Sequence, residues 1–228
     1  MEKDFSIVEK KIDTVFKNKD LLKQAFVHKS YINENRDFPL GHNERLEFLG
    51  DAVLELVVTE HLYRNFPNPE GELTNWRSAL VKGESLSEES NRLEFNDFLY
   101  LSHGESKGSE RARNIILANA FEAVIGAIYE DQGYNAAKKF IDKNITVKLE
   151  KILENSLHVD PKSKFQETAQ EKLGATPRYE VLEEDGPDHN KHFVVGVYVN
   201  GNKYGQGEGS SKQQAAINAA DNAIKKGF

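Results

Sequence analysis

The sequence of 228 residues contains no cysteine, which excludes disulfide bonds and metal sites built on thiolates. It also lacks any apolar run close to the ~18 residues that a membrane-spanning helix needs, so no membrane association is expected. The N-terminal stretch MEKDFSIVEKKIDTVF is charged and amphipathic, which is not the pattern of a secretory signal. Together these absences favour a cytoplasmic protein.

Positive charge is scarce as well. The 30 Lys and Arg residues face 37 Asp and Glu residues, which gives a net charge of -7. Phosphate binding usually needs a basic surface, so this balance argues against a nucleic-acid partner. Such a partner requires local basic patches, or metal ions held by the acids.

Hydrophobic periodicity predicts an all-α first part, up to about residue 155. The predicted helical segments are 21–31, 44–66, 71–93, 112–133 and 135–155. Thr74 is a candidate N-cap within the third segment. Pro161 breaks any continuing helix, so we expect a domain at 1–155, a linker at 156–160 and a second domain at 161–228.

The second domain has a mixed pattern. A short helix at 162–174 precedes two strands, 177–185 and 192–201, joined by the turn GPDHNK. A third strand at 204–209 and a helix at 210–226, capped by Ser210 or Ser211, complete an α-β-β-β-α order. The GQGEG stretch in the third strand resembles a phosphate-binding loop only superficially, because it lacks the lysine such a loop needs.

Three acids lie at helical spacing in the stretch NERLEFLGDAVL. Glu44, Glu47 and Asp51 share one helix face, while their neighbours are mostly apolar. Like charges in such a setting repel one another, and burying them is costly unless a cation compensates. A bound divalent metal ion would resolve the repulsion.

A second apolar helix carries Asn119 and Glu122, one helical step apart. If the two helices pack side by side, Glu47, Asp51, Asn119 and Glu122 converge. Such an all-oxygen site suits Mg²⁺, with Mn²⁺ as a possible substitute, rather than zinc. Carboxylate-held Mg²⁺ is a common arrangement for phosphodiester hydrolysis.

An ordinary structural interpretation competes with this one. Acids at helical spacing usually form a solvated face or pair with basic neighbours, and Arg45 is available here. Spacing alone favours that interpretation, although the apolar surroundings of Glu122 count against it.

Longer motifs point further. The stretch NERLEFLGDAVL resembles the hallmark motif of the ribonuclease III family of double-stranded-RNA endonucleases. FPNPEGELTNWRSALVKGESLS, LSHGESKG and ILANAFEAVIGAIYEDQGY resemble the segments that follow in bacterial members. The α-β-β-β-α tail is similar to the double-stranded-RNA-binding domain that those members carry, so the resemblance covers most of the chain in family order.

The resemblance implies roles for individual residues. Glu47 and Asp51 match metal-binding acids, Glu122 matches the acid most closely tied to catalysis, and Glu44 matches an acid near the RNA cleft. Phe48 matches an aromatic residue that inserts into a partner subunit, which implies a homodimer. The implied products have 5′-phosphate and 3′-hydroxyl ends with short 3′ overhangs, in a role in rRNA or mRNA processing.

Asn119 departs from the family pattern, which usually has Asp at that position. An amide offers a metal its carbonyl oxygen but no negative charge, so we expect weaker metal affinity. The presence of Glu47, Asp51 and Glu122 favours retained activity. The alternatives are a catalytically weakened protein that still binds double-stranded RNA, and a structural dimer whose acids are surface charge.

In the tail, the resemblance implies contacts of Gln166, Gln170 and His189 with successive minor grooves. It places Ser210, Ser211 and Lys212 at phosphates, and a helix N-terminus suits anions. Without the resemblance, the two glutamines and the histidine would be ordinary exposed residues. Residues 160–228 carry nine Lys or Arg against ten Asp or Glu, so we expect modest RNA affinity that falls with salt.

Overall fold

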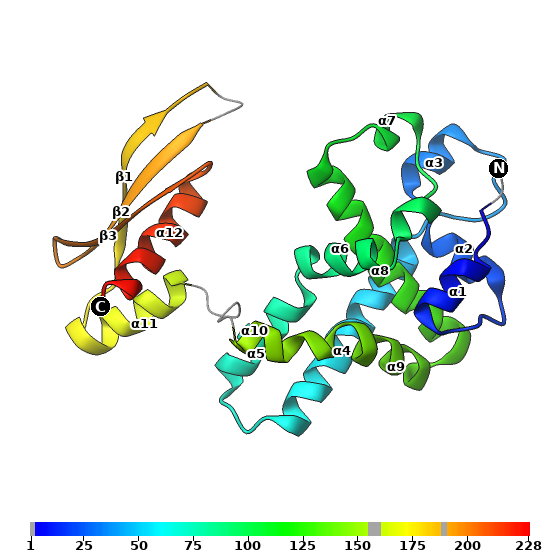
Figure 1. Cartoon of the computed structure of the whole chain (residues 1–228), viewed down its shortest axis with the longest axis horizontal. Coiled ribbons are helices and arrows are strands. Elements are labelled where there is room, and N and C mark those ends of the chain that lie inside the picture. The colour runs from blue at the N-terminus through cyan, green and yellow to red at the C-terminus, as the bar shows by residue number, and fades with distance from the viewer. Residues whose placement is uncertain (1–2, 155–160, 188–190) are drawn as a thin grey trace. The chain divides into compact units, whose positions relative to one another are not determined.

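The computed structural model describes residues 3–154, 161–187 and 191–228. The chain divides into two compact units, Met1–Asn155 and Ser156–Phe228 (Figure 1). The expected linker at 156–160 lies outside the described residues. Within the described parts of the chain, no helix has the length and apolar character of a membrane span.

The first unit is helical, as the periodicity predicts, and its described part contains one isolated bridge, between Val27 and Tyr100. Its elements are α1 (Ser6–Ile12), α2 (Lys19–Ala25), α3 (Lys29–Glu34), α4 (Glu44–Asn65), α5 (Glu70–Val81), α6 (Gly83–Arg92), η1 (Phe95–Phe98), α7 (His103–Ser106), α8 (Glu110–Gln132), α9 (Tyr134–Asn144), η2 (Thr146–Lys148) and α10 (Leu149–Glu154).

Helices α4 and α8 form the centre of this unit, and their packing is the most extensive between any two of its described elements. The contact closes around two glycines. A Cβ built on Gly50 would overlap the carbonyl oxygen of Glu122, and one built on Gly126 would overlap that of Leu46. The two backbones therefore touch, and only residues without a side chain fit at the crossing.

The helix boundaries near Pro69 differ from the prediction. Helix α5 begins at Glu70 directly after Pro69, and Thr74 lies inside the helix, where its hydroxyl donates a hydrogen bond to Glu70. The prediction that Thr74 caps this helix was therefore wrong, because the helix already begins directly after Pro69. The segment 71–93 is also interrupted at Lys82, whose extended backbone separates α5 from α6.

The second unit has the predicted element order. It contains α11 (Pro161–Leu173), β1 (Arg178–Asp185), β2 (His192–Val199), β3 (Asn202–Gly209) and α12 (Lys212–Lys225). The strands form an antiparallel sheet in the order β1-β2-β3, and both helices contribute to one core against it (Figure 1). Alternate residues of β2 enter this core; they are Phe193, Val195, Val197 and Val199.

The glycines of β3 explain why α12 lies so close to the sheet. A Cβ on Gly207 would overlap the backbone of Asn218 and Ala219 in α12. The facing side of α12 is lined by alanines, which are fully or almost fully buried: Ala215, Ala216, Ala219, Ala220 and Ala223. The GQGEG stretch is therefore a packing surface for a helix.

The α4–α8 crossing yields a stability prediction. Gly50→Ala should lower the free energy of unfolding by about 3 kcal/mol or more, because the added methyl group has no space. Gly71→Ala in α5 is the matched control, since a Cβ there meets nothing within 4 Å, and its effect should stay below about 1 kcal/mol. Urea unfolding of both variants checks this, and equal stability of the two would contradict the crossing.

Candidate active site and RNA-binding surface

The α4–α8 crossing brings together the polar residues that the sequence analysis singled out. Glu47 and Asp51 flank Gly50 on α4, while Asn119 and Glu122 lie on the adjoining part of α8. Glu122 interacts electrostatically with both Asp51 and Glu47, and Asn119 forms a side-chain hydrogen bond with Glu47. The structure thus places all four polar side chains in one cluster.

Burial and mutual repulsion shift the titration of this cluster. Burial, followed by the charges of Asp51 and Glu47, raises the pKa of Glu122 to about 7. Burial and the nearby charges of Glu44 and Asp51 also raise the pKa of Glu47, and the hydrogen bond with Asn119 partly opposes this rise. An excess of negative charge is the electrostatic condition under which a cation binds.

Glu44 lies on the same helix but in a different environment. Its carboxylate pairs with Lys29 at 3.2 Å and lies 3.7 Å from the His42 ring, while the side chain is about half exposed. The basic residue considered earlier as a partner, Arg45, forms no ion pair with the clustered acids in the part of the chain that the structure describes.

The donor set matches a magnesium-type ion in kind, because it offers three carboxylates and one amide oxygen and no sulfur or nitrogen ligand. Among the described residues, no three acidic or histidine side chains already have the arrangement of a formed metal site. To hold an ion, Glu47, Asp51 and Glu122 would have to turn toward a common point. A hollow of about 580 Å³ borders Asn119 and is lined also by residues of α6, including Gly83, Glu84 and Ser87.

The face of α4 that points to solvent carries an apolar stripe. Phe48 is 82% exposed, Leu56 57% and Tyr63 79%. Their spacing of eight and seven residues places them along one side of the helix. Of these three residues only Phe48 was expected at an interface, although the helical spacing of Leu56 and Tyr63 was the signal that would have extended the stripe.

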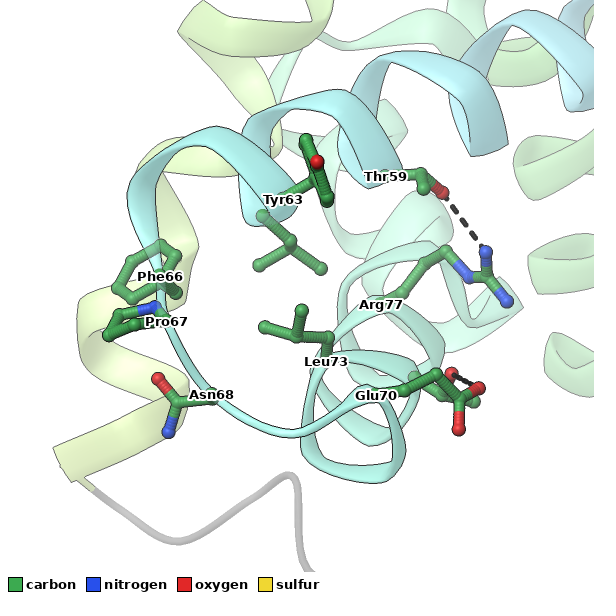
Figure 2. A pocket seen from close by; sticks show the side chains of 10 residues that line it. Thr59, Tyr63, Phe66, Pro67, Asn68, Glu70, Leu73 and Arg77 are labelled. Carbon is green, nitrogen blue, oxygen red and sulfur yellow. Dashed lines mark hydrogen bonds between the residues drawn. The ribbon is translucent and has the colours of Figure 1, made fainter.

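A pocket of about 650 Å³ opens at the C-terminal end of this stripe (Figure 2). Its walls come from the end of α4, the following loop and α5, and Figure 2 shows Tyr63, Leu73 and Arg77 around the opening. Arg77 donates a hydrogen bond to the Thr59 hydroxyl at 3.0 Å. Phe66, another lining residue, packs edge-on against the buried Trp76 with ring centroids 5.2 Å apart.

In the second unit, the residues expected to contact RNA are mostly exposed. Gln166 and Gln170 lie one helical turn apart on α11 and are open to solvent. Ser211 is the N-cap of α12, since its side chain accepts a hydrogen bond from the Gln214 amide at 3.1 Å, and Ser210 precedes it. Lys212 pairs with Glu184, and His189 lies outside the described residues.

Family models match both units. Residues 18–149 match the model described as ribonuclease-III-like, and residues 161–226 match the double-stranded RNA binding motif. The protein is therefore of the class in which a helical ribonuclease-III-like domain is followed by a double-stranded-RNA-binding domain.

Individual relatives agree with this class. The chain is 44% identical over 212 residues to Ribonuclease 3 of Enterococcus faecalis, covering 92% of both chains. It is 45% identical over 223 residues to Ribonuclease 3 of a Geobacillus species, covering 97% of this chain and 90% of that one. The solved nuclease domain of ribonuclease III from Campylobacter jejuni is 39% identical, with a TM-score of 0.56, covering 62% of this chain and 98% of that one. The chain belongs to the ribonuclease III family and is an endoribonuclease.

The raised pKa of Glu122 predicts how stability depends on pH when a chelator is present. The group titrates near 4.5 in the unfolded chain and near 7 in the folded one, so folding stability falls as the pH rises between these values. Glu122→Gln removes this loss. It should stabilise the protein on the order of 1–2 kcal/mol at pH 8, less than the full shift would give because the side chain is partly exposed, and hardly at all at pH 4.5.

Urea unfolding at the two pH values measures this difference. Glu130→Gln, at an exposed acid of the same helix, is the control and should change little at either pH. A gain from Glu122→Gln that is the same at both pH values would contradict the clustering of the acids.

Proposed function

We propose that this protein hydrolyses double-stranded RNA in a Mg²⁺-dependent reaction, with Glu47, Asp51, Asn119 and Glu122 as the ligands of the metal. The observation that carries the proposal is the gathering of three carboxylates and one amide around the α4–α8 crossing, where burial and repulsion raise the pKa of Glu122 to about 7. Mn²⁺ is a possible substitute because it takes the same oxygen ligands.

When bound, the metal supplies an activated water molecule and stabilises negative charge on the phosphate. The residues of the chain provide the rest. The backbones of α4 and α8 touch, so the four ligands lie on two closely packed helices, and a turn of their side chains toward a common point would complete the site. No protein nucleophile is needed, and the expected products carry 5′-phosphate and 3′-hydroxyl ends with short 3′ overhangs.

The active form in this proposal is a homodimer. Leu56 lies midway along α4 between Phe48 and Tyr63, so a two-fold axis near Leu56 would set Phe48 of one copy opposite the Tyr63 end of the other. The apolar pocket beside Tyr63 has room for a phenyl ring (Figure 2). The solved Campylobacter jejuni domain is described as having a region involved in dimer formation, which supports the same assembly here.

The second unit would hold the duplex through Gln166, Gln170, His189 and the N-terminus of α12, where Ser210, Ser211 and Lys212 lie. Glu44 would contribute near the cleavage centre. The proposed setting is the cytoplasm, and the proposed tasks are the processing of rRNA precursors and of messengers.

A second candidate function is a double-stranded-RNA-binding protein with weakened catalysis. The observation that favours it is Asn119, because an amide gives the metal one negative charge fewer than a carboxylate. Its hydrogen bond with Glu47 also occupies part of that carboxylate.

A single cleavage experiment separates these functions. The purified protein and its Asn119→Asp variant are incubated with a long RNA duplex across a Mg²⁺ series, a Mn²⁺ series and a chelator. We expect metal-dependent cleavage by the native chain, with half-maximal activity at a Mg²⁺ concentration about tenfold lower in Asn119→Asp, because ligand charge sets affinity. Cleavage by Asn119→Asp alone would establish the weakened protein.

Glu122→Gln should lower cleavage roughly 100-fold or more while duplex binding, which depends on phosphate contacts elsewhere, stays within about threefold. Gel-based cleavage and a filter-binding assay in chelator measure the two effects. Full cleavage by this variant would refute the assigned metal site.

The dimer predicts a separate effect of Phe48. Phe48→Ala should weaken self-association by about tenfold or more, because an exposed aromatic anchor is lost, while the stability of the folded monomer is unchanged. Val15→Ala is the control, since Val15 is 74% exposed and lies off the α4 stripe. Sedimentation equilibrium gives both dissociation constants, and equal values would show that Phe48 lies outside the interface.

A further inference from the structure

The lysine at the start of α12 is held by a carboxylate of the neighbouring sheet. Glu184 lies near the end of β1. Its Oε2 atom is 3.0 Å from the Nζ atom of Lys212, and its Oε1 atom is 2.9 Å from the Nζ atom of Lys191. Both oxygens of the carboxylate are thus engaged by ammonium groups. We refer to Glu184, Lys191 and Lys212 as the lysine–glutamate triad.

Strand register explains how this triad forms. Glu184 lies opposite Phe193 in the β1–β2 pairing, and Phe193 lies opposite Gly209 in the β2–β3 pairing. The three residues lie side by side across the sheet, and Gly209 lies against Gln214 and Ala215 in the first turn of α12. The ammonium group of Lys212 lies 5.4 Å from the centre of the Phe193 ring, so both the ring and the carboxylate hold it toward the sheet.

The carboxylate of Glu184 reduces the positive charge at this end of the sheet, in a domain that has few basic side chains. The two lysine hydrogen bonds keep the pKa of Glu184 below its usual range, so the carboxylate is ionised at neutral pH and the triad has a net charge of about +1 instead of +2. Residues 160–228 carry only nine basic side chains against ten acidic ones. One of these, Lys225, already pairs with Asp221 at the far end of α12.

We propose that Glu184 lowers the affinity of this domain for double-stranded RNA, by neutralising lysine charge that the phosphates would otherwise meet. The proposal rests on the proposed contact of Lys212 with phosphate. On binding, phosphate oxygens replace the carboxylate as partners of Lys212, and the side chain of Glu184 stays close to the RNA as a repelling charge. Glu184 is a positioning and affinity-setting residue rather than a direct RNA ligand.

The test compares two variants of the full chain with the native protein, in chelator so that no RNA is cut. Glu184→Gln should bind a short blunt RNA duplex about 3- to 10-fold more tightly at low salt, and the gain should shrink as salt is raised. The slope of log affinity against log salt should become steeper, which a purely structural change would not produce.

Glu180→Gln is the matched control. It changes the net charge by the same amount on the same strand, but Glu180 lies opposite Gly196, whose neighbours Val195 and Val197 point to the helix side, so it is on the other face of the sheet. Its affinity should stay within about twofold of native, because a distant exposed charge is screened. Thermal melting checks that both variants are folded.

A further variant tests whether Glu184 acts through its lysine partners. In a Lys212→Gln background, Glu184→Gln should give a smaller gain than in the native chain. Equal affinities of Glu184→Gln and Glu180→Gln, or weaker binding by Glu184→Gln, would overturn the inference while leaving duplex binding by the native chain intact. Failure of every protein to bind the duplex would instead overturn the proposed RNA contact and this inference together.

Discussion

The direct contact between the backbones of α4 and α8 is the constraint on which the rest of the helical unit depends. Gly50 and Gly126 each leave room for a carbonyl oxygen of the other helix, so the two helices lie closer than side chains would allow. Glu47 and Asp51 lie on either side of Gly50 in the sequence, and the backbone carbonyl of Glu122 occupies the space that a side chain at Gly50 would fill. The close packing of the two helices and the clustering of the acids therefore depend on the same short segments of α4 and α8.

This arrangement also has an electrostatic cost. Glu122 is largely enclosed by the crossing and faces two other acids, which destabilises its charged form. Stability gained from tight apolar packing around the crossing offsets that cost, with Leu54, Val57, Phe121 and Ile125 fully buried nearby. Such a balance is typical of functional sites, where groups are held in an arrangement that is unfavourable until the ligand arrives.

Much of the fold could be predicted from the sequence because long apolar segments and clear turn signals determine it. Helices α4 and α8 are such apolar segments, and the turns between short segments give the α-β-β-β-α order. The start of α5 was mispredicted, because the helix begins directly after Pro69, five residues before the Thr74 that was expected to cap it. The sequence predicts that four polar residues converge if α4 and α8 pack side by side; they are Glu47, Asp51, Asn119 and Glu122. Whether the helices approach closely enough depends on Gly50 and Gly126, and the role of these glycines is visible only in the packing.

Contacts between distant segments escaped prediction for the same reason. The pocket beside Tyr63 needs α5 to fold back against α4, and the pairing of Glu184 with Lys212 needs a strand and a helix separated by two further strands. Neither has a local pattern, since each is created by tertiary arrangement. The extension of the Phe48 stripe to Leu56 and Tyr63 is different, because a helical repeat already contained it.

The edge-on packing of Trp76 against Phe66 gives the protein a built-in optical probe. Trp76 is the only tryptophan of the chain, it is buried, and Phe66 joins it directly to the wall of the apolar pocket. Its emission therefore originates from one known place, without any label. A side chain that enters the pocket would alter the surroundings of Phe66, and the fluorescence of a single indole would register the event in real time.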